Sequence, residues 1–191
     1  MTEFFSILIT AAILNNIVLV QQLGISSLFA FSPRLQTAAD MAIASFPVMV
    51  LSTIINLTLL RLVLVPLNLQ ALALVLFVLV SAGIVTLLAA TVSKALPLAW
   101  HRHGLELLLL SGNSAIIGLA LSTTLTAAPI PVLLASIFGS ALGFSVLLLL
   151  FAAFNERLQL LPIPPAFAGM PIRLISAGIV SLCLLSMSGA A

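Results

Sequence analysis

Long apolar runs, separated by short polar or proline-bearing breaks, make up most of the chain. The runs at residues 69–92 and 131–154 are nearly uninterrupted, and each is long enough to cross a bilayer as a helix of about 20 residues. The breaks contain turn-forming residues such as Pro33 and Pro66. The pattern therefore predicts six spans, at residues 4–23, 38–60, 69–92, 105–121, 131–154 and 172–189.

We expect these spans to be helices. The chain lacks the period-two alternation of β-strands, and a helix satisfies all of its backbone hydrogen bonds within lipid. The predicted fold class is an all-α integral membrane protein with six transmembrane helices in a single domain, residues 1–191. From this length we expect no additional soluble catalytic domain.

The composition supports a membrane location and excludes other classes of protein. Hydrophobic residues make up 63% of the chain and charged residues 5%, whereas about a quarter of the residues of a soluble domain are charged. The lipid bilayer is thus the expected environment. No basic run is interleaved with aromatic residues, so we expect no nucleic-acid partner. The single cysteine, Cys183, excludes an internal disulfide and an all-cysteine metal site within one chain.

The positive charges divide unequally between the two sides of the predicted bundle. Lysine and arginine concentrate in the cytoplasmic loops of membrane proteins. We therefore expect the loops after the first, third and fifth spans to be cytoplasmic, and both termini to lie on the outer side of the membrane. The cytoplasmic group is Arg34, Lys94, Arg102, Arg157 and Arg173, and the opposite side has Arg61.

Two of the predicted spans are interrupted by polar and glycine residues. The first contains Asn15 and Asn16 and is followed by Gly24, and the fourth contains Gly112 and Asn113. Such residues favour broken helices whose freed backbone groups face protein or a cavity. Because each interrupted span opens one half of the chain, we expect two inverted three-helix repeats, approximately residues 1–97 and 98–191. The same residue types also join intact helices, and the residues alone leave both interpretations open.

The ionisable residues of the spans offer little for catalysis. Asp40 and Glu106 lie near predicted helix starts, where a carboxylate also stabilises the helix dipole. His101 and His103 have no further donors nearby that would complete a metal site. The chain also lacks a nucleophile and base at catalytic spacing and a phosphate-binding glycine loop. We therefore expect no catalytic residue, no metal site and no catalysis by this chain alone.

The fifth span contains a pair of glycines at helical spacing. Gly139 and Gly143 form a G-x-x-x-G pattern, which lets another helix approach closely. The pattern predicts helix packing, within the chain or with a partner subunit, and says nothing about a substrate.

Several short segments indicate a protein family more specifically than the overall composition does. They are residues 14–24 (LNNIVLVQQLG), 65–69 (VPLNL), 112–118 (GNSAIIG), 150–158 (LFAAFNERL), the loop with Pro164, Phe167 and Gly169, and 175–178 (ISAG). Their order and spacing over nearly the whole chain resemble the A-type subunits of the Rnf (also called Rsx) ion-translocating electron-transport complexes. This family is related to the D-type and E-type membrane subunits of the sodium-pumping NADH:quinone reductase.

The resemblance implies a function and a set of partners. Rnf complexes pass electrons between ferredoxin and nicotinamide nucleotide pools and couple this transfer to the movement of Na⁺ or H⁺. The implied partners are the Rnf subunits of types B, C, D, E and G. The most important is the E-type subunit, which is a homologue of opposite topology. In the family, a cysteine from each broken helix contributes to a [2Fe–2S] cluster held between these two sister subunits.

The chain departs from the family pattern at these cluster positions. The two cysteines correspond to Ser26 and Ser114, and no cysteine or histidine nearby replaces them. The pKa of a hydroxyl lies far above that of a thiol, and iron–sulfur clusters are held chiefly by thiolates. Ala89 also stands where the resemblance leads us to expect an acidic residue. We predict that this chain supplies no ligands to a normal cluster.

Two interpretations of the function follow. The chain is either a membrane subunit of an ion-translocating oxidoreductase complex, diverged at its cluster positions, or a small transporter, assembly or scaffold protein with the same fold and no redox function. The scarcity of intramembrane charges and the two serines favour the second interpretation. The similarity over the whole chain favours the first.

Overall fold

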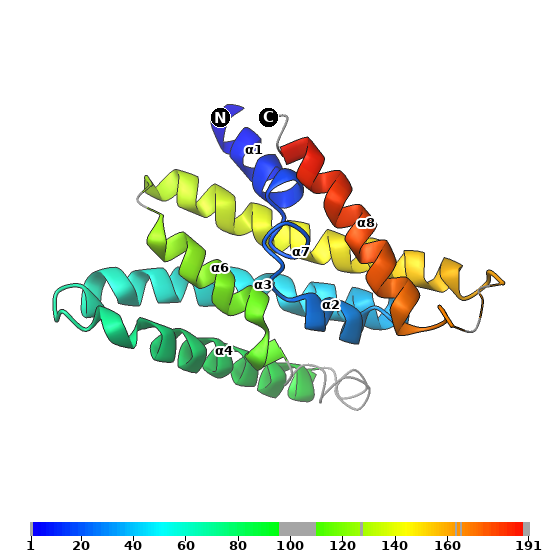
Figure 1. The fold of residues 1–191 in the computed structure, drawn as a ribbon. Helices are drawn as coiled ribbons and strands as arrows, with labels where there is room; N and C mark the ends of the chain where they lie inside the picture. Colours follow the sequence, from blue (N-terminus) through cyan, green and yellow to red (C-terminus); the bar gives the residue numbers. More distant parts are fainter. Residues whose placement is uncertain (1, 96–109, 127, 163, 165, 189–191) are drawn as a thin grey trace.

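The computed structural model describes residues 2–95, 110–126, 128–162, 164 and 166–188, and every regular element in these ranges is a helix (Figure 1). The all-α fold predicted from the sequence is confirmed. The elements are α1 (Thr2–Ile9), the π-helical turn η1 (Thr10–Leu14), α2 (Ile25–Phe31), α3 (Leu35–Leu59), the π-helical turn η2 (Leu60–Leu64), the 3₁₀ turn η3 (Gln70–Leu72), α4 (Ala73–Ala95), the 3₁₀ turn η4 (Leu110–Gly112), α6 (Ser114–Leu125), α7 (Ile130–Leu158) and α8 (Met170–Ser188).

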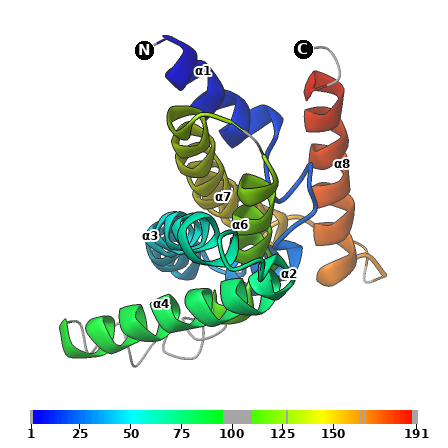
Figure 2. The ribbon, with the colours of Figure 1, turned by 90° about the vertical axis from the view of Figure 1, so that its left-hand side faces the viewer.

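The two longest helices, α3 and α7, lie side by side and antiparallel at the centre of the molecule (Figures 1 and 2). Ser145 of α7 donates a hydrogen bond to the carbonyl of Ala42 in α3 across 3.2 Å. Farther along the pair, the rings of Phe46 and Phe138 have centroids 6.3 Å apart. Both helices contribute fully buried side chains, such as Phe144, to one apolar core.

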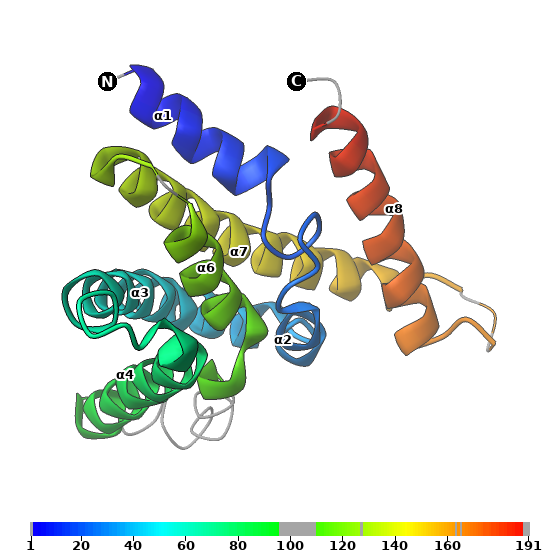
Figure 3. The same cartoon turned by 60° about the vertical axis from the view of Figure 1, so that its left-hand side comes forward.

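Three other helices, α1, α4 and α8, flank this central pair on opposite sides. Helix α4 packs on α3, whereas α1 and α8 lie beyond α7 (Figure 3). Much of the outward surface of α4 is apolar, and Leu74, Val75, Leu79 and Leu87 are all exposed. A row of exposed aliphatic side chains of this kind suits contact with lipid or with another membrane subunit.

Among the described residues, three helices are long and apolar enough to cross a membrane, at Leu35–Leu64, Gln70–Thr91 and Ile130–Leu158. They match the predicted second, third and fifth spans within a few residues. The other described apolar helices are shorter, at Glu3–Leu14, Leu110–Leu125 and Met170–Ser186. The predicted sixth span ends at Gly189, which lies outside the described residues.

The interruptions predicted in the first and fourth spans are present in the structure. In the first span, helical structure ends at Leu14 and resumes at Ile25. In the fourth span, α6 begins at Ser114 after the 3₁₀ turn. Residues 105–109 lie outside the described residues. In both segments, polar side chains bind backbone groups that a continuous helix would have used.

The start of α1 and the end of α8 lie at the same end of the molecule in all three ribbon views (Figures 1, 2 and 3). An even number of membrane crossings would produce this arrangement. The order of elements also repeats, because an interrupted segment, a long central helix and a flanking helix occur twice along the chain. This order fits the predicted inverted repeat with halves at residues 1–97 and 98–191, which stays a prediction.

Candidate functional site

The first helix break depends on the side chain of Asn16. Its Nδ2 donates to the carbonyl of Ala12 across 2.9 Å, and its Oδ1 accepts from the backbone N–H of Val18 at 3.0 Å and of Leu19 at 3.4 Å. The amide thus satisfies a carbonyl at the end of the helix and two N–H groups of the following turn. Asparagine competes with the helical hydrogen-bond pattern in this way, so the chain leaves the helix here.

The central part of this break, residues 16–19, is buried in the protein. Ile17, Val18 and Leu19 are all buried in the core. Asn15 lies at the surface, where its Oδ1 accepts a hydrogen bond from Nε2 of Gln21 at 3.2 Å. Irregular backbone at membrane depth is tolerated where it is enclosed by protein, and the burial of the turn meets this requirement.

The second break depends on Asn113. Its Oδ1 accepts a hydrogen bond from the N–H of Ala115 at 3.0 Å and so caps the N-terminus of α6. The residue is buried, and its Nδ2 has no partner among the described residues. Gly112, directly before it, ends the 3₁₀ turn at the surface. In both breaks, therefore, the Oδ1 atom of an asparagine singled out in the sequence accepts a hydrogen bond from the backbone N–H two residues later.

The two breaks meet in the tertiary structure. The backbone N–H of Gly24 donates to Oγ of Ser114 across 2.9 Å. Gly24 has φ +78°, and a Cβ at this position would lie 2.6 Å from Cβ of Ala115. Next to it, Leu23 packs so closely on Gly118 that a Cβ there would overlap with the leucine side chain. Gly24 and Gly118 thus allow the breaks to touch.

Ser26 and Ser114 lie on either side of this junction. Ser26 is in the first turn of α2, two residues after Gly24, and Ser114 is the first residue of α6. Both residues are exposed on the surface of the single chain. Each of the two helices that begin at the junction therefore carries an exposed serine in its first turn.

The glycine pair of α7 contacts the first helix. A Cβ on Gly139 would overlap with the carbonyl of Leu8, and a Cβ on Gly143 would overlap with the carbonyl of Ala12. The G-x-x-x-G pattern is thus used within the chain, where it lets the backbones of α1 and η1 approach α7. This approach sets the position from which the first break begins.

The other residues singled out in the sequence lie away from the junction or outside the described ranges. Asp40 is exposed in the second turn of α3, and Cys183 is exposed on α8. Glu106 and the histidines at 101 and 103 fall in the segment 96–109, which is not described. Within the described residues, no three His, Cys, Asp or Glu side chains come together in a way that could hold a metal ion.

Asn155 and Glu156, at the end of α7, lie in the segment 150–158 that carries the resemblance, but no sequence pattern gave either side chain a role. Nδ2 of Asn155 donates to Oγ of Ser32 at 3.0 Å, and Oε1 of Glu156 accepts from the N–H of Leu35 at 2.8 Å. The pair therefore holds the turn between α2 and α3 and caps the N-terminus of α3. A signal was present, since this polar pair ends a long apolar run, but nothing local identifies its partners.

The comparisons with known proteins agree with this architecture. The family model described as "Rnf-Nqr subunit, membrane protein" matches residues 4–191. The chain belongs to the Rnf-Nqr family. A relative in Alcanivorax borkumensis is 39% identical over 190 residues, which cover 99% of this chain and 98% of the relative. Relatives in Azotobacter vinelandii and Syntrophotalea carbinolica are 39% and 36% identical, with the same coverage of both chains.

All three relatives are named as the A-type subunit of an ion-translocating oxidoreductase complex. The resemblance found from the sequence segments is thus confirmed at the level of the family and the type of subunit. Membership of this family and the long apolar helices among the described residues support a multi-pass membrane protein. Gly24 and Ser114, which form the junction, both lie within residues 4–191, the part of the chain that the family model matches.

Proposed function

We propose that this chain is a membrane subunit of an ion-translocating oxidoreductase complex that couples electron transfer to Na⁺ or H⁺ transport. Relatives named as the A-type subunit of such a complex are similar over 99% of the chain, which supports a corresponding place in a complex. The observation that carries the proposal is the contact of the two helix breaks through Gly24 and Ser114. Because the two helix breaks are in contact, they form one irregular region of the membrane domain, and a partner subunit can cover this region.

The proposed partner at this face is the E-type sister subunit of opposite topology, within a complex that also contains the subunits of types B, C, D and G. The face contains the exposed residues Ser26 and Ser114 and the starts of α2 and α6. The predicted orientation places both termini on the periplasmic side of the inner membrane. A sister subunit of opposite orientation would then bring its own breaks to the same level of the bilayer.

The side chains at this face do not fit a [2Fe–2S] cluster. Ser114 Oγ already accepts the Gly24 hydrogen bond, and both candidate ligands are hydroxyls. Clusters of this type are held by thiolates, or by histidine in one variant, and neither is present in the described residues of the two breaks. We therefore propose that the chain supplies no cluster ligand and acts in the complex as a scaffold and coupling subunit.

The proposal is tested on a tagged chain purified with its partners from detergent-solubilised membranes. Flavin-bearing and iron–sulfur subunits should copurify, and iron and flavin should be measured on the same sample. The Ser26→Ala and Ser114→Ala variants should leave the iron content and the electron paramagnetic resonance signal unchanged. A stoichiometric cluster that disappears in either variant would contradict the proposed absence of ligands from this chain.

A second experiment introduces the missing thiols. The double variant S26C/S114C should raise the [2Fe–2S] signal if the sister subunit still supplies two cysteines. Thr58→Cys is the control, because it adds an exposed thiol near the C-terminal end of α3, whereas α2 adjoins the N-terminal end of that helix. An equal increase in both proteins would show that added thiols bind iron without regard to position.

The alternative function, a transporter or an assembly protein without redox chemistry, is favoured by the same two serines. Purification separates the two functions. A stable oligomer of this chain that lacks flavin-bearing and iron–sulfur partners would support the alternative and reject the proposed subunit role.

A further inference from the structure

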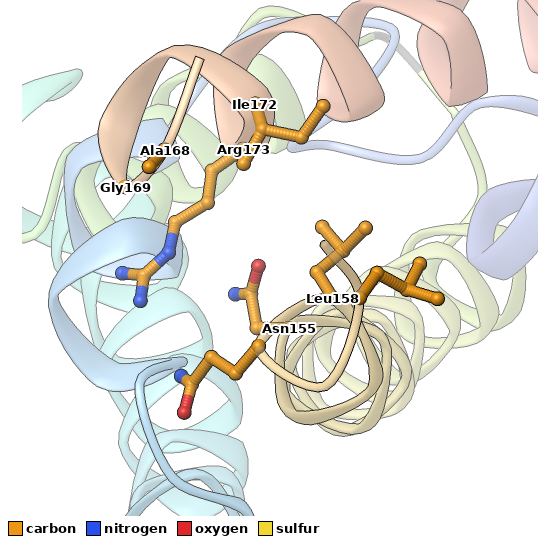
Figure 4. Close-up of a pocket in the computed structure, with 8 residues that line it drawn as sticks. Asn155, Leu158, Ala168, Gly169, Ile172 and Arg173 are labelled. Carbon is orange, nitrogen blue, oxygen red and sulfur yellow. The ribbon is translucent and has the colours of Figure 1, made fainter. Parts of the chain in front are cut away.

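A cavity of about 230 Å³ lies between the end of α7 and the start of α8, away from the junction of the two breaks (Figure 4). Its polar groups are the side chains of Asn155, Gln159 and Arg173. The other walls are mostly apolar and include Leu158, Leu161 and Ile172. The cavity therefore combines one cationic side chain with amide groups in an apolar setting.

Asn155 provides a buried acceptor at this cavity. The residue is 1% exposed, and its Nδ2 is used by Ser32 through bonds of 3.0 Å to Oγ and 3.3 Å to the carbonyl oxygen. Its Oδ1 has no hydrogen-bond partner among the described residues. Figure 4 shows the amide pointing into the space between α7 and α8. A buried acceptor without a donor costs free energy, so a ligand that donates a hydrogen bond here is favoured.

Arg173 provides the positive charge. It is half-buried in the first turns of α8, and its side chain extends along the cavity (Figure 4). Within the part of the chain that the structure describes, the guanidinium of Arg173 forms no ion pair and no hydrogen bond. A cation near a helix N-terminus is repelled by the positive end of the helix dipole, and the first turn of α8 contains no acidic residue. An anion at this position would remove the repulsion.

The surface around the cavity is apolar. Leu160 is 78% exposed, and Leu161, Met170 and Leu174 are each more than half exposed. Exposed aliphatic side chains next to a guanidinium at helix ends are typical of the level where the lipid headgroups meet the acyl chains. Free phosphate would use only the charge, whereas a phospholipid would also cover this apolar surface.

We propose that this cavity binds the headgroup of an anionic phospholipid. The guanidinium of Arg173 holds the lipid phosphate, and Oδ1 of Asn155 accepts a hydrogen bond from a headgroup hydroxyl. Phosphatidylglycerol has both groups, whereas phosphatidylcholine has no headgroup donor. The acyl chains would run along the exposed side of α8. Since Asn155 also binds Ser32, the lipid would join the end of α7, the start of α8 and the turn before α3.

The test measures lipid binding to the purified protein, with its copurifying subunits, by native mass spectrometry. The probes are phosphatidylglycerol, phosphatidylcholine and inorganic phosphate. Phosphatidylglycerol should bind best, and Arg173→Gln should weaken its binding about tenfold or more, because one charge-assisted contact is lost. Arg157→Gln is the matched control, since Arg157 lies near the same end of α7 but does not line the cavity. The affinity of the Arg157→Gln variant for phosphatidylglycerol should stay at the wild-type value.

Other outcomes would overturn the proposal. Equal binding of both lipids, or equal losses in the two arginine variants, would show that the headgroup is not recognised here. Inorganic phosphate that competes with the lipid at equal concentration would indicate a free-anion site. Loss of a partner subunit in Arg173→Gln, with lipid affinity unchanged, would assign the cavity to a protein contact. If Arg173→Gln does not fold, Arg173→Lys keeps the charge and should still bind more weakly than Arg157→Gln.

Discussion

The backbone N–H of Gly24 donates a hydrogen bond to the hydroxyl of Ser114, 90 residues away in the sequence, across 2.9 Å. This bond joins the start of α2 to the start of α6, so neither helix break is an isolated defect. The serine occupies a position where the family resemblance implies a cysteine. A residue that would otherwise be taken for a lost ligand therefore has a structural role in this chain.

Removal of this hydroxyl should destabilise the chain. We expect Ser114→Ala to lower the free energy of unfolding by about 1 kcal/mol, because a partly buried N–H loses its acceptor. Ser26→Ala is the control, since Ser26 is exposed and no hydrogen bond of its side chain is found in the described structure. Thermal unfolding in detergent should show a lower Tm for the first variant alone. Equal Tm values for the two variants would contradict the structural role of Ser114.

Gly24 should not tolerate a side chain. The substitution Gly24→Ala places a Cβ 2.6 Å from that of Ala115, on a backbone with φ +78°. We expect a loss of about 2–4 kcal/mol, from overpacking and from the left-handed backbone together. Gly83→Ala is the control, because Gly83 lies within α4 and has no atom within 4 Å of an added Cβ. It should be neutral or slightly stabilising, and comparable losses at both sites would reject the close contact of the breaks.

The docking of the first helix on α7 is open to a similar test. Gly143→Ala places a Cβ against the backbone of Ala12, 2.8 Å from the Cα of Ala12. We expect the free energy of unfolding to fall by about 1–3 kcal/mol. The helix α1–η1 cannot move away without exposing Ala11, which is buried. Gly178→Ala, on the open side of α8, serves as the comparison. Protease sensitivity of the N-terminal segment should increase in the first variant and stay unchanged in the second.

Glu156 should contribute to stability through the helix that it caps. Glu156→Ala removes the acceptor of the Leu35 N–H and should cost about 1 kcal/mol, in the usual range for a lost N-terminal cap. Glu156→Gln keeps an oxygen at this place and should recover most of the loss. Denaturation of the three proteins at low and high salt measures the effect. If Gln is as damaging as Ala, the negative charge matters more than the hydrogen bond.

Much of the fold could be predicted from local pattern, because the length of an apolar run and the polarity of its ends are properties of neighbouring residues. The runs predicted the long helices at α3, α4 and α7 within a few residues. Asn16 and Asn113 also indicated where the helices break, since an asparagine side chain bonds to backbone groups two to four residues away.

The partners of these positions came only from the tertiary structure. The sequence predicted that Gly139 and Gly143 pack against a helix, but the close backbone approach of α1 and η1 is what identifies it. Glu156 reaches a helix start 121 residues earlier in the sequence, and Gly24 reaches Ser114 across 90 residues. Hydrogen bonds and close backbone contacts of this kind depend on how helices cross in space, and the crossing is set by the packing of the whole bundle rather than by the residues next to each site.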